Sequence, residues 1–420
     1  MIVFFYNLIV IPIIQLLVLC ISQFNTKLKE REKAWKTTLL TLEKLPQNTK
    51  RVWFHAASLG EFEQAKPIIE RLKSQNQNLS IIVSFYSPSG YRNVKEYPQA
   101  DAIVYMPIDT RRKAKQFIEM MNPNVAVFIR YELWLNHLNI LSNKNISTFL
   151  FCATFPNAKI WKLIFLHQFL SAILNNFTGI YTVSDFETHS FKQLLLDIPV
   201  TTSRDTRFDR IISVVETVKD FEDIIPESYF KSDELILVAG STWQKDEEII
   251  IDSLEQIEKK GYGIRPIIVP HEPTRDHCMN LKRKFQESVL LSELNSQTDY
   301  GKCIIIDSIG KLLLLYGVAD IVYVGGGFGF GVHSTAEPAA YGVPIVCGRN
   351  ISRSPDAQNL EQLGALTSIN SSENLMEWLE KMITNPSERI SRGEKAKQYV
   401  YKGAGGSKTC ADIIEKSMEF

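Results

Sequence analysis

The chain lacks several motifs that assign proteins to common functional classes. Its six cysteines are scattered without a Cys-x-x-Cys pair, which argues against a disulfide scaffold or zinc knuckle and favours a reducing compartment. No Gly-x-Gly-x-x-Gly opens the first predicted βαβ unit and no Gly-Lys-Ser/Thr occurs, so the dinucleotide fingerprint and the Walker loop are both missing. No two aspartates stand two positions apart, and no His/Cys/carboxylate cluster is typical of a zinc or iron site. We therefore expect no metal ion and no cofactor.

The chain also lacks an excess of charge of either sign. Its 420 residues contain 47 Lys and Arg against 47 Asp and Glu, which argues against a nucleic-acid partner. With 45% hydrophobic and 22% charged residues, the composition excludes wholesale disorder, and the length predicts two or three domains.

Charge is absent altogether from the first segment, Ile2–Phe24, where Ile, Leu, Val and Phe dominate. About 20 such residues suffice to span a bilayer. Neither the preceding basic residues nor the small-residue cleavage site of a signal peptide is present, whereas five basic residues follow within Lys27–Lys36. We expect residues 1–24 to form a single transmembrane anchor at the inner membrane, with the rest on the cytoplasmic face and the basic stretch near anionic lipid. A buried or interfacial helix is the alternative.

The remaining sequence alternates short apolar runs with longer amphipathic stretches, which is typical of βαβ units and a mostly parallel sheet. The predicted strands are Val52–Ala56, Ser80–Phe85, Ala102–Tyr105, Val125–Ile129, Ser147–Phe151, Gly179–Val183, Leu235–Ala239, Pro266–Val269, Cys303–Ile306, Ile321–Val324 and Pro344–Val346. The predicted helices include Glu61–Leu72, Arg111–Met121 and Glu132–Leu141.

This pattern predicts an α/β fold of two Rossmann-like domains facing a cleft. We expect an N-terminal domain over residues 25–205, a linker over 206–232 and a C-terminal domain over 233–420. The final helical stretch, Asp412–Met418, is expected to pack back onto the first half.

Two motifs of the first half follow predicted strands. In Ala57–Glu61 a small, glycine-containing turn opens a helix, so Glu61 is placed either to take a proton from a bound hydroxyl or only to complement the helix dipole. In Arg130–Trp134 the arginine stands at a strand's carboxyl end, and Glu132 is expected to pair with a neighbouring basic group. A third residue, Arg207 at the predicted linker, has the planar fork that suits phosphate or carboxylate.

The second half carries a stronger glycine signal. Gly240–Thr242 follows a strand and opens a helix, as anion cradles do. Five glycines fall within the seven residues Gly325–Gly331, which allows the backbone to approach a ligand closely. Glu337 stands four residues beyond His333 and suits the paired hydroxyls of a ribose.

Taken in order, the motifs resemble the family of 3-deoxy-D-manno-octulosonic acid (Kdo) transferases of lipid A synthesis. The shared pieces are His55–Glu61, Ser87–Gly90, Tyr105–Asp109, Glu132–Trp134, Arg207–Asp209, Gly240–Thr242, Asp307–Gly310, Leu314–Gly317 and His333–Pro338. The resemblance runs along nearly the whole chain and implies the GT-B glycosyltransferase architecture, with an acceptor-binding first domain and a CMP-Kdo-binding second domain.

The resemblance also implies an activity. It is the metal-independent transfer of Kdo from CMP-Kdo to the tetraacyldisaccharide lipid A precursor (lipid IVA) in lipopolysaccharide biosynthesis. Glu61 matches the family's general base, and Arg130 and Arg207 match positions that stabilise the transition state. The family commonly has Glu where Arg130 stands and Lys where Arg207 stands. Arg207 keeps its charge, whereas Arg130 reverses it and is alternatively a ligand for a carboxylate or a lipid A phosphate.

The CMP contacts that the resemblance implies lie in three segments of the second half. They are His271, Glu272, Ile309, Gly310, Lys311, Ser334, Thr335, Ala336 and Glu337. The rival interpretations are another GT-B nucleotide-sugar glycosyltransferase or epimerase, and a non-catalytic membrane-anchored binding protein. The sequence leaves open the number of Kdo residues added, the acyl-chain preference and the oligomeric state.

Overall fold

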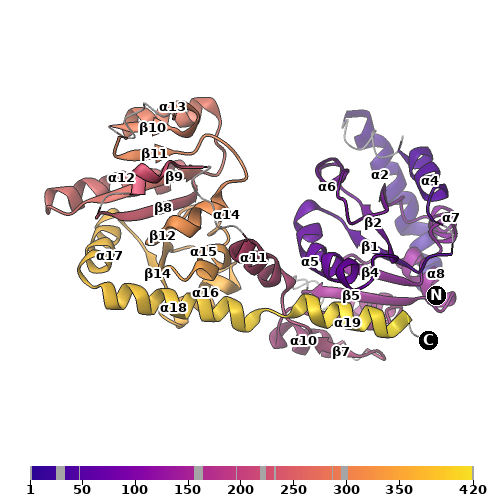
Figure 1. Cartoon of the computed structure of the whole chain (residues 1–420). Coiled ribbons are helices and arrows are strands. Elements are labelled where there is room, and N and C mark those ends of the chain that lie inside the picture. The colour runs from indigo at the N-terminus through magenta and orange to yellow at the C-terminus, as the bar shows by residue number, and fades with distance from the viewer. Residues whose placement is uncertain are drawn as a thin grey trace. The chain divides into compact units, whose positions relative to one another are not determined.

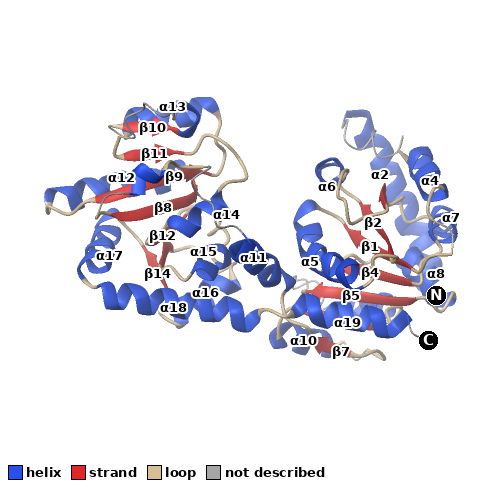
Figure 2. Ribbon diagram, in the orientation of Figure 1, coloured by secondary structure: helices blue, strands red, loops and turns tan. Residues whose placement is uncertain are grey.

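The computed structural model describes residues 2–24, 34–46, 48–155, 164–194, 196–217, 224–230, 233–285, 287–294 and 301–418 (Figure 1). The chain divides into two compact units, which we call unit 1 (Met1–Arg210 with Ala404–Phe420) and unit 2 (Ile211–Gly403). In each, helices pack on a parallel sheet (Figure 2), so the predicted α/β fold with two Rossmann-like units is confirmed.

Within the described residues, the sheet of unit 1 has seven strands in the order β3-β2-β1-β4-β5-β6-β7, all pairs parallel. The strands are β1 (Arg51–Ala56), β2 (Ser80–Phe85), β3 (Ala102–Tyr105), β4 (Val125–Ile129), β5 (Ser147–Ala153), β6 (Gly179–Thr182) and β7 (Val200–Thr202). Alternate residues of β1 enter two separate cores, Trp53 on one face and Val52 with Phe54 on the other. A sheet buried on both faces explains why its strands read as continuous apolar runs.

The next helices of unit 1 either precede β1, as α4 does, or lie in the connections between the strands. They are α4 (Trp35–Glu43), α5 (Leu59–Gln75), α6 (Pro88–Val94), α7 (Arg111–Met121), α8 (Leu135–Asn143), α9 (Ile164–Leu174) and α10 (Asp185–Lys192). The prediction that a helix begins at Glu132 was wrong. Helix α8 starts only at Leu135, so Glu132 lies in the loop that follows β4.

The N-terminal segment differs from the predicted transmembrane helix. None of the helices among the described residues has both the length and the apolar character needed to cross a membrane. The segment consists of α1 (Ile2–Phe5), the π-helix η1 (Tyr6–Val10) and α2 (Ile11–Phe24). Tyr6 and Ile11 are buried in the core of unit 1. Part of this helical segment therefore packs on unit 1.

Polar side chains fix this packing. The Tyr6 hydroxyl donates to Asp109 Oδ2 over 2.9 Å, and Asn7 exchanges two hydrogen bonds of 2.9 Å with Asn136. Asp109 is itself buried and accepts from His137 Nδ1 over 2.6 Å. Such partners are costly to leave unpaired, so they tie Tyr6 and Asn7 to the body of unit 1. The basic stretch that was expected near anionic lipid lies partly outside the described residues, which do not include Lys27, Lys29, Arg31 and Lys33.

Unit 2 repeats the plan of unit 1. Its described strands follow the order β10-β11-β9-β8-β12-β13-β14 and pair in parallel. They are β8 (Leu235–Thr242), β9 (Ile264–Pro270), β10 (Ser288–Leu290), β11 (Cys303–Ile305), β12 (Ile321–Val324), β13 (Ile345–Gly348) and β14 (Leu366–Ile369). The helical elements are η3 (Glu227–Phe230), α12 (Gln244–Lys259), α13 (Arg275–Lys284), η4 (Leu291–Glu293), α14 (Leu312–Leu315), η5 (Tyr316–Val318), α15 (Ala336–Tyr341), α16 (Pro355–Gln362), α17 (Ser372–Thr384) and α18 (Pro386–Gly403).

The chain passes between the two units at two places, within α11 and just before α19. Helix α11 (Thr206–Thr217) occupies the start of the predicted linker, and the boundary between the units falls inside it, at Arg210. Helix α19 (Gly406–Met418) belongs to unit 1, where it packs beside α5 (Figure 1) and buries Cys410, Ala411 and Ile414. The end of the chain thus completes the core of unit 1.

Candidate active site

The candidate site of unit 1 lies where β1 and β4 end side by side. The strand order reverses between these two strands, and ligands of open α/β sheets bind at such a switch point, beyond the carboxyl ends. Glu61 follows β1, and Arg130 and Glu132 follow β4. The topology therefore brings together side chains that stand about seventy positions apart in the sequence.

A capping box at the start of α5 holds Glu61. The Ser58 hydroxyl accepts from the Glu61 N–H over 3.4 Å, while Glu61 Oε2 accepts from the backbone N–H groups of Ala57 (2.5 Å) and Ser58 (3.2 Å). Both of these hydrogen bonds use Oε2; among the described residues Oε1 accepts none. The two interpretations of Glu61 are therefore compatible, because one oxygen caps the helix and the other is left for a proton.

The surroundings of Glu61 raise its pKa above the usual value. The main cause is burial, since the residue is only 5% exposed, and the second is the nearby carboxylate of Glu132. The backbone hydrogen bonds from Ala57 and Ser58 act in the opposite direction. A carboxylate tuned in this way takes up a proton more readily at neutral pH, as a general base must.

Arg130 occupies the end of β4 in an unusual conformation. Its φ of 68° lies in the left-handed region, which non-glycine residues adopt uncommonly and which recurs at functional sites. Its backbone N–H remains bonded to the Phe151 carbonyl over 2.9 Å, and its guanidinium lies 5.9 Å from the centre of the Tyr131 ring. Arg130 Nε is buried and, within the described part of the chain, has no hydrogen-bond partner. This donor is available to an anionic ligand.

Glu132, which the sequence indicated only as a partner for a basic group and not as a site residue, also follows β4 at this site. Its Oε2 accepts from Trp134 Nε1 over 2.8 Å and lies 3.4 Å from Nε2 of the fully buried His55. The expected basic partner is thus an imidazole on β1. The alternation of the sequence places Trp53 and His55 on one face of β1. That His55 faces Glu132 follows only from the register of β1 on β4.

Arg207 lies in the first turn of α11 and is held by Asp205. Its Nε and Nη2 contact Asp205 Oδ2 at 2.8 and 2.6 Å, and its backbone N–H donates to Oδ1 at 2.9 Å. Its side chain remains 42% exposed while Asp205 is buried, so the ion pair orients the guanidinium rather than enclosing it.

The candidate site of unit 2 lies at the corresponding place, where β8 and β12 end side by side. Gly325 N donates to the Gly240 carbonyl over 2.8 Å, and a Cβ at Gly325 would overlap the Ser241 carbonyl. Buried Asp246 accepts from the N–H groups of Gly326 (2.9 Å) and Trp243 (3.0 Å). The glycine loop is thus tied to the start of α12.

Three aromatic rings stack beside this loop. His271 and His333 lie 4.2 Å apart and nearly parallel, and the Trp243 ring lies 4.8 Å from His271. Trp243 Nε1 donates to His333 Nε2 over 3.0 Å. The stack places two imidazoles at the carboxyl end of the sheet, where they offer both a flat surface and N–H donors.

The other residues predicted to contact CMP occupy three loops or helix starts of unit 2. Glu272 follows β9 and is exposed, Ile309 and Gly310 form an exposed turn before Lys311 and α14, and Ser334–Glu337 lead into α15. Thr335 is buried, and its Oγ1 has no hydrogen-bond partner among the described residues. Glu337 lies in the first turn of α15. All are beyond the carboxyl ends of strands of unit 2.

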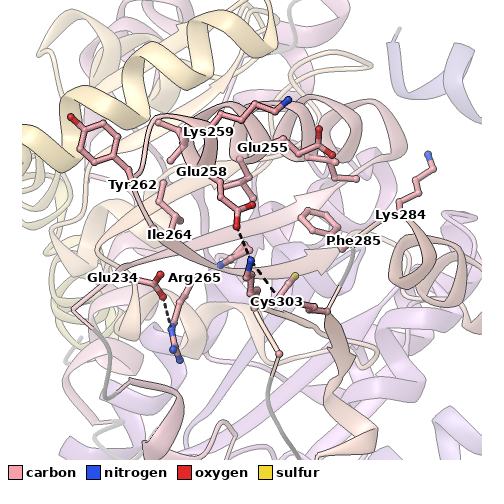
Figure 3. A pocket seen from close by; sticks show the side chains of 18 residues that line it. Glu234, Glu255, Glu258, Lys259, Tyr262, Ile264, Arg265, Lys284, Phe285 and Cys303 are labelled. Carbon is pink, nitrogen blue, oxygen red and sulfur yellow. Dashed lines mark hydrogen bonds and ion pairs between the residues drawn. The ribbon is translucent and has the colours of Figure 1, made fainter.

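A cavity of about 520 Å³ opens at the opposite end of the same sheet (Figure 3). It is bounded by the starts of β9 and β11 and the end of α12, and two ion pairs lie in its lining, Glu234 with Arg265 at 2.9 Å and Glu258 with Lys302 at 2.7 Å. It contains none of the predicted site residues. We therefore place the chemistry at the switch point and not in this cavity.

The described residues gather no group of three His, Cys, Asp or Glu side chains that could hold a metal ion. In the candidate site of unit 1, Arg130 and Arg207 offer positive charge.

The fold has close structural relatives. A UDP-GlcNAc 2-epimerase from Neisseria meningitidis matches with a TM-score of 0.62 and 12% identity, covering 88% of this chain and 99% of that one. A glycosyltransferase from Rickettsia africae matches with a TM-score of 0.58 and 13% identity, covering 89% and 98%. The architecture is that of the GT-B class, and because it serves both reactions it does not select one.

The sequence comparisons identify the family within this class. Residues 27–210 match the family model described as 3-deoxy-D-manno-octulosonic-acid transferase (kdotransferase). A 3-deoxy-D-manno-octulosonic acid transferase from Haemophilus influenzae is 23% identical over 380 residues, covering 88% of this chain and 87% of the relative. These matches confirm the resemblance to the Kdo transferase family that the motifs indicated.

Proposed function

We propose that the protein transfers Kdo from CMP-Kdo to a hydroxyl of lipid IVA in lipopolysaccharide biosynthesis. The observation that carries this proposal is the buried Glu61 carboxylate at the switch point of unit 1, with Oε1 unoccupied among the described residues. Glu61 takes the proton of the acceptor hydroxyl, whose oxygen forms a bond to the anomeric carbon of Kdo. The bond from that carbon to the phosphate oxygen breaks, and CMP leaves with the electron pair.

Positive charge for this reaction comes from side chains. Arg130 offers a buried Nε without a partner among the described residues, which suits the carboxylate of Kdo or a phosphate of lipid IVA. Arg207, oriented by Asp205, stabilises the developing charge. In unit 2, the stacked imidazoles of His271 and His333 and the turn at Gly310 and Lys311 receive CMP, and Glu337 accepts from the ribose hydroxyls.

The donor and the acceptor are tested together by mass spectrometry. Purified protein is incubated with lipid IVA and either CMP-Kdo or UDP-GlcNAc, with and without EDTA. We expect Kdo-lipid IVA from CMP-Kdo alone, at the same rate in EDTA. Product from UDP-GlcNAc, or epimerised UDP-GlcNAc, would assign the chain to another reaction of the same fold.

We further propose that the protein works at the cytoplasmic surface of the inner membrane, and that its N-terminal helices lie on the lipid. The face of these helices that does not pack on unit 1 carries exposed apolar side chains, namely Phe4, Phe5, Leu8, Ile9, Ile13, Leu16 and Leu17. An apolar face followed by a basic stretch is typical of helices that lie in the interface of an anionic membrane.

Replacing Leu8 and Leu16 by glutamate is expected to weaken binding to vesicles that contain anionic lipid by at least about tenfold, because two apolar anchors become charges. Vesicle sedimentation measures this binding. Leu363→Glu, which changes an exposed leucine of unit 2, is the matched control and should bind as the unchanged protein does. Undiminished binding of the double variant would show that this face is not the lipid contact.

A further inference from the structure

A polar chain runs from the interior of unit 1 to its candidate site. Trp53 Nε1 lies 2.8 Å from Ser84 Oγ, and Ser84 Oγ lies 2.8 Å from His55 Nδ1. An indole N–H can only donate, so the Ser84 oxygen accepts from Trp53 and its own hydrogen is free to point at His55. In the neutral imidazole the proton then resides on Nε2.

The Nε2 atom of His55 points at Glu132. The atoms lie 3.4 Å apart, yet the geometry does not make a hydrogen bond, and this fully buried nitrogen has no hydrogen-bond partner among the described residues. Glu132 Oε2 is already held by Trp134 Nε1 at 2.8 Å. Catalytic hydrogen bonds are often long before substrate binds, and a small rotation of Glu132 would close this one.

Glu61 and Glu132 follow the neighbouring strands β1 and β4, and the negative charge of Glu132 opposes the ionisation of Glu61. After burial, it is the largest cause of the raised pKa of Glu61, and His55 acts in the opposite direction. The other groups against Glu61 are the uncharged N–H donors of Ala57 and Ser58. A negative charge on Glu132 therefore makes Glu61 hold a proton more firmly, and the hydrogen bond from Trp134 holds the Glu132 carboxylate in place.

We propose that Glu132 is a positioning residue: Trp134 holds it and His55 faces it, so that its carboxylate acts on the base Glu61 at the ends of the neighbouring strands β1 and β4. This inference rests on the proposed function, in which Glu61 receives the proton of the acceptor. It assigns to the loop after β4 a role apart from that of Arg130: the arginine meets the anionic substrate, while the carboxylate two positions later tunes the base.

The test compares pH profiles of Glu132→Gln and of the unchanged protein. Glutamine preserves the shape and removes the charge, so we expect the acidic limb of kcat/KM with CMP-Kdo and lipid IVA to move down by a few tenths to about one pH unit. Trp134→Phe keeps the ring but removes a donor to Glu132, and it should produce a smaller shift in the same direction. Glu119→Gln on α7, an exposed glutamate, is the matched control and should leave the profile unchanged.

Direct titration of the Glu61 carboxyl by carbon-13 NMR provides a readout that needs no substrate, with the resonance assigned by Glu61→Gln. A lower pKa of Glu61 in Glu132→Gln supports the inference. If Glu132→Gln lowers activity equally at every pH and leaves the Glu61 titration in place, Glu132 is only structural and the inference is wrong. If Glu132→Gln does not fold, the same criteria apply to Trp134→Phe. An active Glu61→Gln would instead overturn the proposed function.

Discussion

At the scale of single residues, both candidate sites depend on which atom donates each hydrogen bond and which atom accepts it. Trp243 can only donate, so the Nε2 atom that it contacts on His333 must carry no proton, and a neutral His333 is protonated on Nδ1. Burial lowers the pKa of His333 and the stacked His271 lowers it further, although Asp246 acts in the opposite direction. Together these effects favour the neutral form of the His333 ring, which a bound ligand or a lower pH would protonate.

The lowered pKa of His333 makes the stability of the folded protein depend on pH in the acidic range. Because the pKa of His333 is lower in the folded state, unfolding takes up a proton once the pH falls below the ordinary histidine value of about 6.5. We expect the urea midpoint to decline below that pH, and His333→Asn to decline less steeply. His189→Asn, an exposed histidine of α10, should follow the unchanged protein. Parallel declines in all three proteins would contradict the assignment.

Sequence reasoning reached some of these residues and not others for a physical reason. Glu61 belongs to a local Ser-x-x-Glu capping pattern, which four consecutive residues specify by themselves. Glu132 becomes part of the site only through β1 and β4, which lie side by side but are far apart in the sequence. Strand register of this kind is not encoded in any local window.

At the scale of the element, apolar runs located the central strands well. The predicted ranges of Ser80–Phe85, Ala102–Tyr105, Val125–Ile129 and Ile321–Val324 match the observed β2, β3, β4 and β12. Strands β7, β10 and β14 were not predicted, because these sheet strands have only three or four residues and mix polar with apolar side chains. The apolar content of the N-terminal segment is visible in the sequence and predicted a membrane span, whereas the contacts of Tyr6 and Asn7 with unit 1 are not visible there.

The glycine loop after β12 has a tightly constrained backbone. Gly326 has a φ of 90°, and a Cβ there would lie 2.5 Å from the Gly331 carbonyl oxygen. Gly326→Ala should cost about 1–3 kcal/mol of unfolding free energy and weaken CMP binding, because the loop must move. Urea unfolding and calorimetry measure the two effects.

Gly261→Ala is the matched control for this loop. Gly261 has a similar φ of 85° but open space around its Cβ position, so it should lose only the smaller backbone cost and keep its affinity for CMP. Equal losses in both variants would show that crowding within the loop plays no part.

At the scale of the whole molecule, the last residues of the chain belong to unit 1 and complete its core. Helix α19 fills a gap in the core of unit 1 with Cys410, Ala411 and Ile414, and Asp209 Oδ1 accepts from the N–H of Gly405 over 3.0 Å. The periodicity of the sequence indicated a helix here. The sequence does not show which core this helix completes, because α19 packs on α5, some 350 residues away along the chain.

Truncation after Gly403 is therefore expected to destabilise unit 1 and spare unit 2, although the deleted residues follow unit 2 in the sequence. Limited proteolysis should cut the first half, while CMP binding by unit 2 persists. Cleavage that begins in unit 2, with unit 1 protected, would contradict this division of the core.

The central claim concerns Glu61, and one measurement tests it most directly. The rate of Kdo transfer to lipid IVA is compared for the unchanged protein, Glu61→Gln and the control Glu119→Gln, with CMP binding measured on the same samples. The account predicts that Glu61→Gln loses at least about a hundredfold in rate while it binds CMP normally, and that Glu119→Gln is unaffected. A Glu61→Gln variant that transfers Kdo at a comparable rate would contradict the account.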